Sequence, residues 1–250
     1  MKKQLLLGVS LVVLAGATTA RAAPPVTPVT AIYNWTGWYA GVNVGYSWGT
    51  AKSTYTDPSF GPGPTSFSGT EHLNGAIAGG QVGYNWQVGT SWVWGLEADV
   101  QTSGEKGSRT YVSDCEGSGA TCVQNQSAKI LWFGTVRGRF GALVNPNLWL
   151  YATGGLAYGE VVASGSVSIT NVPISWSYSS STTNVGWTLG AGIEGALPGT
   201  RAWTWKAEYL YLDLGSVSGT GRDPFFGSTY SYSARFTDNI FRIGFNYGFH

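Results

Sequence analysis

The sequence predicts an all-β protein, an eight-stranded antiparallel up-and-down transmembrane β-barrel. Three observations lead to this fold class. Glycine makes up 37 of the 250 residues and aromatic residues 14%, whereas charged residues are only 11%. Apolar residues recur at every second position in eight segments, the period of a strand with two different faces. The connectors between these segments alternate between long and short, which is typical of a closed barrel with an even number of strands.

The composition also excludes several other classes of protein. A net charge of +1 provides no basic surface for nucleic acid. A disordered chain is rich in charge and poor in aromatic residues, and this chain is the reverse. So much glycine also argues against a helical protein, because each glycine inside a helix costs about 1 kcal/mol.

The N-terminus has the features of a bacterial export signal. Lys2 and Lys3 precede an apolar stretch that is too short to span a membrane, and Ala20–Arg21–Ala22 forms an A-x-A cleavage site. We therefore expect residues 1–22 to be a signal peptide. Residues 23–35, rich in proline, are expected to form an extended periplasmic leader, and residues 36–250 the barrel.

The eight strands are expected where period-2 segments lie between turn residues. Their approximate ranges are 38–48, 76–88, 92–102, 130–142, 148–158, 185–197, 203–211 and 241–249. Residues 49–74, 103–129, 160–184 and 212–238 form the long connectors, and residues 89–91, 143–147 and 198–202 the short ones. Both ends of the barrel chain then lie on the side of the short turns. We expect that side to be periplasmic and the long loops to be extracellular, in the outer membrane of a Gram-negative cell.

Eight charged residues in the strand centres decide which face of the barrel is apolar. All of them lie opposite the large apolar side chains: Glu97, Asp99, Arg137, Arg139, Glu194, Lys206, Glu208 and Arg242. A soluble barrel such as a lipocalin would place them in a dry interior while a tryptophan-rich face met water. In a membrane barrel they belong in the lumen, since an Arg or Lys facing lipid at the midplane costs about 2–4 kcal/mol.

Aromatic residues are expected to form two girdles at the membrane interfaces, where an apolar ring with a polar tip is favoured. The girdle residues are Trp38, Trp48, Trp86, Trp92, Trp132, Tyr158, Trp187, Trp203, Tyr211, Phe241, Tyr247 and Phe249.

The function of such a lumen can be interpreted in two ways. The interior of an eight-stranded barrel is just wide enough for its own side chains. The eight charges therefore predict a network that plugs the lumen, and the alternative is a narrow channel for ions or small solutes. Cys115 and Cys122 are expected to form a small disulfide loop, in keeping with an oxidising compartment. The two histidines, His72 and His250, form no catalytic or metal-binding pattern, so we expect neither an enzyme nor a cofactor.

Several stretches resemble a known family. Residues 35–46 (WTGWYAGVNVGY), 80–86 (GQVGYNW), 132–139 (WFGTVRGR) and 151–159 (YATGGLAYG) are similar to signature stretches of alphaproteobacterial outer-membrane immunogenic proteins, as are 95–99 and 206–211. The resemblance covers the mature chain. It implies a porin-like barrel similar to the barrel domain of outer membrane protein A, and an abundant surface antigen.

The resemblance and the sequence together suggest partners. Outer-membrane lipid and lipopolysaccharide are expected around the barrel, and the barrel assembly machinery at the aromatic C-terminal strand, which here ends in His250. Some members of the family are reported to bind haemin. A last hypothesis is therefore a site for haem or a host-surface partner on the fourth long loop, formed by Arg222, Phe225, Phe226 and Tyr230.

Overall fold

The computed structural model describes residues 33–57, 65–115, 120–170, 174–222 and 229–249. The predicted signal peptide and most of the leader lie outside these residues. The strands are β1 Gly37–Asp57, β2 Thr65–Val88, β3 Trp92–Ser103, β4 Lys106–Cys115, β5 Ala120–Asn145, β6 Leu148–Ile169, β7 Ile174–Ala196, β8 Trp203–Arg222 and β9 Thr229–Phe249.

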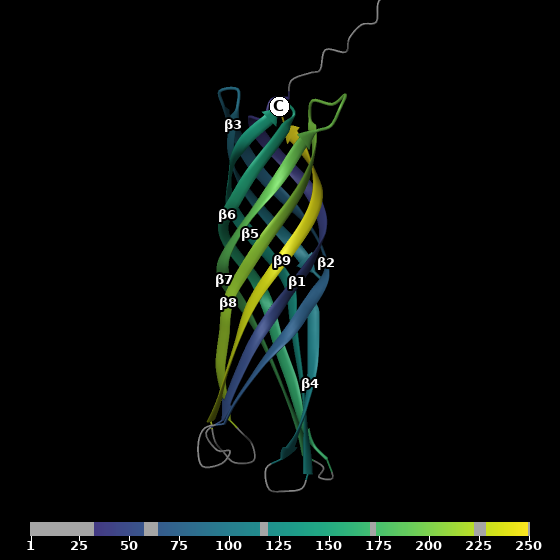
Figure 1. Cartoon of the computed structure of the whole chain (residues 1–250), viewed down its shortest axis with the longest axis vertical. Coiled ribbons are helices and arrows are strands. Elements are labelled where there is room, and N and C mark those ends of the chain that lie inside the picture. The colour runs from purple at the N-terminus through teal and green to yellow at the C-terminus, as the bar shows by residue number, and fades with distance from the viewer. Residues whose placement is uncertain (1–32, 58–64, 116–119, 171–173, 223–228, 250) are drawn as a thin grey trace, which may run out of the picture. The chain divides into compact units, whose positions relative to one another are not determined.

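The strands form a closed ring in which every neighbour is antiparallel (Figure 1). β3 and β4 are two parts of one barrel strand, interrupted at Gly104 and Glu105, and both pair with β5. β1 pairs with β2 on one side and with β9 on the other, which closes the ring. With β3 and β4 counted as one barrel strand, the ring has eight strands, and the predicted fold class is confirmed.

The short connectors are tight turns, as predicted. Gly89 and Gly199 have φ values of +62° and +77°, in the left-handed region that glycine adopts without a steric penalty. Asn145 stabilises its turn through its side chain, whose Oδ1 accepts a hydrogen bond of 2.9 Å from the backbone N–H of Asn147.

The long connectors differ from the prediction, because most of their residues continue the strands. β1 and β2 remain paired from Gly49↔Leu73 as far as Asp57↔Thr65, and β5 and β6 as far as Cys122↔Ile169. The many Ser, Thr and Gly residues were interpreted as loop composition. They instead form the outward face of strands whose inward positions hold small and apolar residues, so that the period-2 signal is weak.

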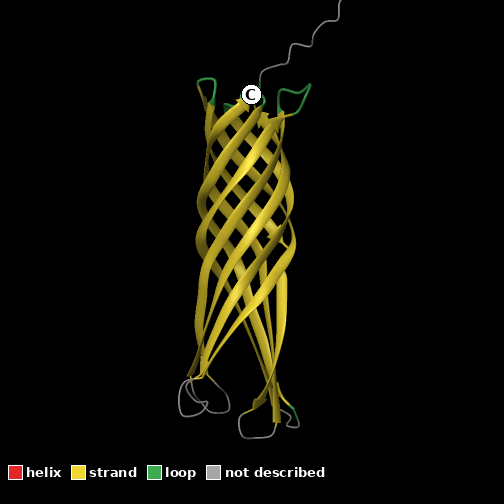
Figure 2. Ribbon diagram, viewed as in Figure 1, coloured by secondary structure: helices red, strands yellow, loops and turns green. Residues whose placement is uncertain are grey.

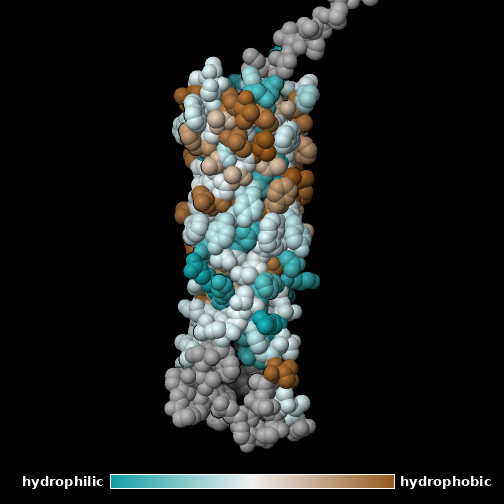
Figure 3. Space-filling view, in the orientation of Figure 1, coloured by the Kyte–Doolittle hydropathy of each residue, from teal (hydrophilic) through white to brown (hydrophobic). Residues whose placement is uncertain are grey.

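The wall of the barrel changes character along its length. Near the short turns, large apolar side chains point outward; Val42, Leu96 and Leu156 are 53–65% exposed. In the half that carries the long hairpins, apolar side chains point inward and form the core of that half. Its members are Ala51, Leu73, Ile77, Ala128, Ile130, Phe133, Ala157, Val161, Leu210, Leu212, Leu214, Val217, Ala234, Phe236 and Ile240. Figure 3 shows hydrophobic side chains gathered toward the short-turn end and hydrophilic ones farther along.

Bulges accompany this change. The register shifts between Ile130 and Trp132 in β5 and between Asp213 and Gly215 in β8. An extra residue moves the following side chains to the opposite face. Gly215 has a φ of +73°, which the bulge requires and which a side chain would disfavour.

The ring also opens in the hairpin half. β2 meets β4 at the single pair Asn74↔Lys106, and the pairing of β7 with β8 ends at Trp187↔Asp213. Beyond these points backbone pairing continues only within two groups of four strands, β8–β9–β1–β2 and β4–β5–β6–β7. Figure 2 shows their ends gathered in two groups. The inward apolar residues of both sheets form one cluster.

The outward apolar face yields a first prediction. Val136, midway along the outward face of β5, is 49% exposed. In phospholipid vesicles, Val136→Arg should lower the free energy of unfolding by about 2–4 kcal/mol, because it places a charge in hydrocarbon. The measurement is guanidinium unfolding followed by tryptophan fluorescence. Val144→Arg, on the same strand beside a short turn, is the control and should cost about 0–1 kcal/mol. Equal costs would contradict a lipid-facing wall.

Candidate functional site

Eight charged side chains fill the lumen of the short-turn half. β3 supplies Glu97 and Asp99, and β5 supplies Arg137 and Arg139. The other four come from β7, β8 and β9: Glu194, Lys206, Glu208 and Arg242. All eight residues are between 0 and 4% exposed. The structure thus brings together all of the residues that the sequence placed on the inner face.

Strand register places opposite charges side by side. Glu97 lies directly opposite Arg137 across β3 and β5, and Glu194 opposite Lys206 across β7 and β8. Glu208 lies opposite Arg242 across β8 and β9. Side chains at such positions have Cβ atoms about 4.5–5.5 Å apart, close enough for ion pairs. The pairing of the strands therefore places six of the eight charged residues directly opposite a residue of opposite charge.

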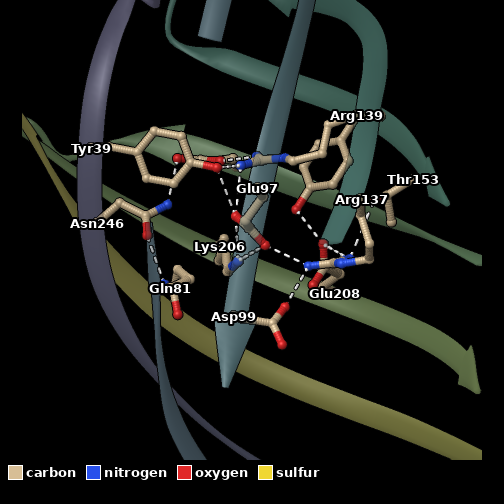
Figure 4. A network of polar contacts seen from close by, with 12 residues as sticks. Tyr39, Gln81, Glu97, Asp99, Arg137, Arg139, Thr153, Lys206, Glu208 and Asn246 are labelled. Carbon is tan, nitrogen blue, oxygen red and sulfur yellow. Dashed lines mark hydrogen bonds and ion pairs between the residues drawn. The ribbon is translucent and has the colours of Figure 1, made fainter. Parts of the chain in front are cut away.

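Arg137 and Arg242 join the strands across the lumen. Arg137 contacts three carboxylates: Glu97, Asp99 at 3.1 Å and Glu208 at 3.1 Å. Arg242 contacts Asp99 at 2.9 Å and Glu208 at 2.6 Å (N to O distances). Lys206 Nζ lies 2.9 Å from Glu97 Oε1 and 3.0 Å from Oε2. Figure 4 shows this network from close by.

Arg139 lies between aromatic rings at the short-turn side of the network. Its guanidinium carbon is 4.4 Å from the ring centre of Trp149 and 4.3 Å from that of Tyr151. It also contacts Glu194, and Glu97 at 2.9 Å. The Tyr39 hydroxyl accepts a hydrogen bond of 2.5 Å from Arg139 and donates one of 2.8 Å to Glu97. The cation–π contacts of Arg139 with Trp149 and Tyr151 are strong because water is excluded from this site.

The network balances its own charge. Four carboxylates face three guanidinium groups and one ammonium group, which gives a net charge of zero. A buried ion is costly unless it is paired and its other polar atoms are hydrogen-bonded. Several neutral side chains provide such bonds: Thr135 donates to Asp99, and Thr204 and Asn246 donate to Glu194. The arrangement is that of an interlocked polar core, with carboxylates already engaged by cations.

An aromatic cluster covers the network at the short-turn mouth. It consists of Tyr33, Trp35, Val93, Trp149 and Tyr151. Trp35 is 2% exposed, and its Nε1 donates a hydrogen bond of 3.1 Å to the Pro146 carbonyl. The backbone N–H of Tyr33 donates to Asn147 Oδ1 at 3.0 Å. Residues assigned to the leader thus lie in the mouth of the barrel. Only the high aromatic content of residues 33–38 could have indicated this.

A second group of buried acids lies on the hairpin side of the network. Glu105, in the break between β3 and β4, and Asp238 in β9 are 2% and 1% exposed. Glu105 Oε1 accepts a hydrogen bond of 3.1 Å from the Ser103 hydroxyl, and Asp238 Oδ2 accepts one from Ser47. Burial, and then the charge of Asp238, raise the pKa of Glu105 to about 9. Both positions lie in segments predicted to be long loops, so the sequence does not indicate the pair.

The predicted girdle residues all point outward, in two groups. Near the short turns, Trp92 stacks on Phe140 at 5.2 Å between ring centres, and Trp203 meets Tyr247 at the same distance. Toward the hairpins, Trp187 lies 5.4 Å from Tyr211 and Trp132 6.0 Å from Tyr158.

Glu160 lies at the hairpin-side group of aromatic residues. Its carboxylate accepts hydrogen bonds from Ser181 at 2.5 Å and from Trp132 Nε1 at 2.9 Å. These bonds lower the pKa of Glu160. Because both donors favour the charged form, the carboxylate stays ionised at the edge of the aromatic girdle.

Two of the predicted sites are only partly described. The side chains of Cys115 and Cys122 lie outside the described residues, so the disulfide stays a prediction; their backbones lie in the paired strands β4 and β5. Phe225 and Phe226 also lie outside them. Arg222 and Tyr230 belong to the paired ends of β8 and β9, so part of the predicted loop site is strand.

Comparison with known proteins identifies the family of this barrel. Residues 9–249 match the family described as the outer membrane protein beta-barrel domain. The chain belongs to this family. It is 36% identical over 230 residues to a 31 kDa outer-membrane immunogenic protein of Brucella melitensis, covering 91% of this chain and 88% of that protein. The resemblance found in the sequence is thus confirmed, and the protein is an outer-membrane β-barrel of a Gram-negative bacterium.

One further relative and one solved structure agree with this placement. A 22 kDa outer membrane protein of Rhizobium leguminosarum bv. viciae is 36% identical over 191 residues, or 76% of this chain and 69% of that protein. The crystal structure of OprG from Pseudomonas aeruginosa aligns with a TM-score of 0.51 at 11% identity, over 87% of this chain and 98% of that one. At this identity the likeness concerns the fold alone.

Removal of one cation should show how strongly the network depends on pairing. Arg137→Ala leaves Glu97, Asp99 and Glu208 short of a counterion, so we expect a loss of about 3–5 kcal/mol in the free energy of unfolding. Guanidinium titration in vesicles measures it. Arg201→Ala, in an exposed turn, is the matched control and should change the value by less than about 0.5 kcal/mol. A small effect at Arg137 would show that the network is loosely held.

The acid pair should make stability depend on pH. The pKa of Glu105 rises from 4.5 to about 9 on folding, so its protonated form favours the folded state. This stabilisation is complete below pH 4.5 and is lost as the pH rises through about 9. We expect the midpoint of thermal unfolding in detergent to fall over that interval. The fall should be reduced in Glu105→Gln. An identical pH profile for this variant would contradict the assignment.

Proposed function

We propose that this protein is a structural and surface-exposed component of the outer membrane, with a lumen plugged by its charged network. The observation that carries the proposal is the set of ion pairs that links eight buried charges from β3, β5, β7, β8 and β9. Figure 4 shows part of this network. An ion passing through would have to break several ion pairs at once. The aromatic cluster at the short-turn mouth and the apolar core of the hairpin half add two further barriers. The alternative of a narrow channel is thereby disfavoured.

The proposal includes an orientation and a role. The short turns and both ends of the barrel face the periplasm, and the long hairpins extend from the cell. The Brucella melitensis relative is named as immunogenic. In this proposal, the exposed hairpins of the present chain are the surface that antibodies and other partners meet. No catalytic step is part of the proposal: His72 points outward from β2 and is exposed. A haem-binding role for the β8–β9 hairpin remains a prediction that haemin titration would test.

Planar-bilayer recording tests the plugged lumen. The refolded full chain should give no stable unitary current steps. Arg137→Ala/Arg139→Ala removes two large side chains and leaves carboxylates unpaired, so this variant should admit small cation currents. Trp35→Ala, which opens only the aromatic cluster, is the control and should remain silent. Stable steps in the wild type that vanish on neutralising Arg137 and Arg139 would establish the channel and overturn the plug.

A further inference from the structure

The outward wall of the hairpin half carries an arc of basic side chains just beyond the aromatic girdle. Lys52 on β1 lies directly opposite Arg235 on β9, and Lys106 on β4 lies directly opposite Lys129 on β5. All four residues are exposed. Like charges at directly opposed positions of a sheet repel each other. An anion between the side chains of such a pair removes this repulsion, and for Arg235 the protein supplies one, the carboxylate of Asp213.

The protein itself does not neutralise most of this arc. Arg235 pairs with Asp213 at 2.6 Å. Among the described residues, Lys52, Lys106 and Lys129 take part in no ion pair. Glu160 is another carboxylate of this half, and its hydrogen bonds come from Trp132 and Ser181. The surface is thus basic although the chain as a whole is nearly neutral.

A hydrophobic groove begins directly beside the Lys106–Lys129 pair, on the side toward the short turns. Its volume is about 660 Å³, and its walls include Val44, Ala76, Ala78, Thr102 and Phe241. The groove exists because the alanines are small and because β3 breaks at Gly104. Asn74, the partner of Lys106, is two residues from Ala76, which is about 7 Å along a strand.

We infer that this wall binds a phosphorylated, acylated glycolipid of the outer leaflet, with a phosphate on Lys106 and Lys129 and an acyl chain in the groove. The order of the two features along the wall matches such a lipid: cations beyond the aromatic girdle, at the level of headgroups, and an apolar groove on the membrane side. A phospholipid would also offer an acyl chain and one phosphate. Lys52, however, is a further exposed cation without an ion pair among the described residues, and a third free cation favours a ligand with more than one anionic group. Lys52 is the second contact.

This inference deepens the surface-interaction role proposed above, and it is tested by lipid binding rather than by conductance. The full chain, refolded in detergent micelles, is titrated with bisphosphorylated hexa-acyl lipid A, and bound lipid is counted by native mass spectrometry. One lipid per barrel is expected. Lys106→Gln/Lys129→Gln should weaken binding roughly 30-fold, about fivefold for each lysine, and added salt should reduce the difference. Ala78→Phe, which fills the groove, should weaken binding without changing any charge.

Two controls separate this site from general attraction. Arg201→Gln removes an exposed cation at the opposite end of the barrel and should bind as the wild type does. Lys129→Glu replaces a repulsive cross-strand pair with an attractive one, so it should fold at least as stably as the wild type and yet lose lipid A. Folding of each variant is verified by its shift in mobility on heating in detergent. Unchanged binding by Lys129→Glu, or equally tight binding of phosphatidylglycerol or of lipid A without phosphates, would overturn the inference.

Discussion

The structure depends above all on the mutual neutralisation of the charges in its lumen. A ring of eight strands is too narrow to hold bulk water and too polar on its inner face to collapse as hydrocarbon. Glu97 meets Arg137, Arg139 and Lys206, and this one carboxylate links three strands of the ring. Because the ion pairs link all eight charged residues into one network, side chains rather than water fill this part of the interior. The outer surface is then free to match lipid.

The barrel consists of two halves with opposite solvation. The half near the short turns has a polar inside and an apolar outside, whereas the hairpin half has a mainly apolar inside, with the buried acids Glu105 and Asp238, and a polar outside. Bulges at Leu131 and Leu214 lie near the boundary. Each adds one residue to its strand and so changes which of the following side chains point inward. The hairpin half resembles a sandwich of two sheets with a polar outer surface, and it continues from the half whose outer surface matches lipid. The basic arc and the groove lie where the two halves meet.

Much of the short-turn half could be predicted from the sequence, because strict alternation places charges and lipid-facing side chains on opposite faces. Three kinds of feature could not. The contacts of Tyr39, Trp149 and Tyr151 with Arg139 depend on shear between strands, which alternation does not give. The hairpins were mistaken for loops, since Ser and Thr are common both in loops and on wet strand faces. The position of Trp35 in the mouth depends on a partner more than a hundred residues away.

That contact has a consequence for the order in which the barrel forms. The hydrogen bonds from Trp35 to Pro146 and from Tyr33 to Asn147 join residues 111 and 114 positions apart. A loop of this length is closed at an entropic cost, so such a contact forms late unless the intervening strands have already shortened the path. The turn that receives Trp35 exists only once β5 and β6 are paired. The N-terminal segment can therefore dock in the mouth of the barrel only after β5 and β6 have paired.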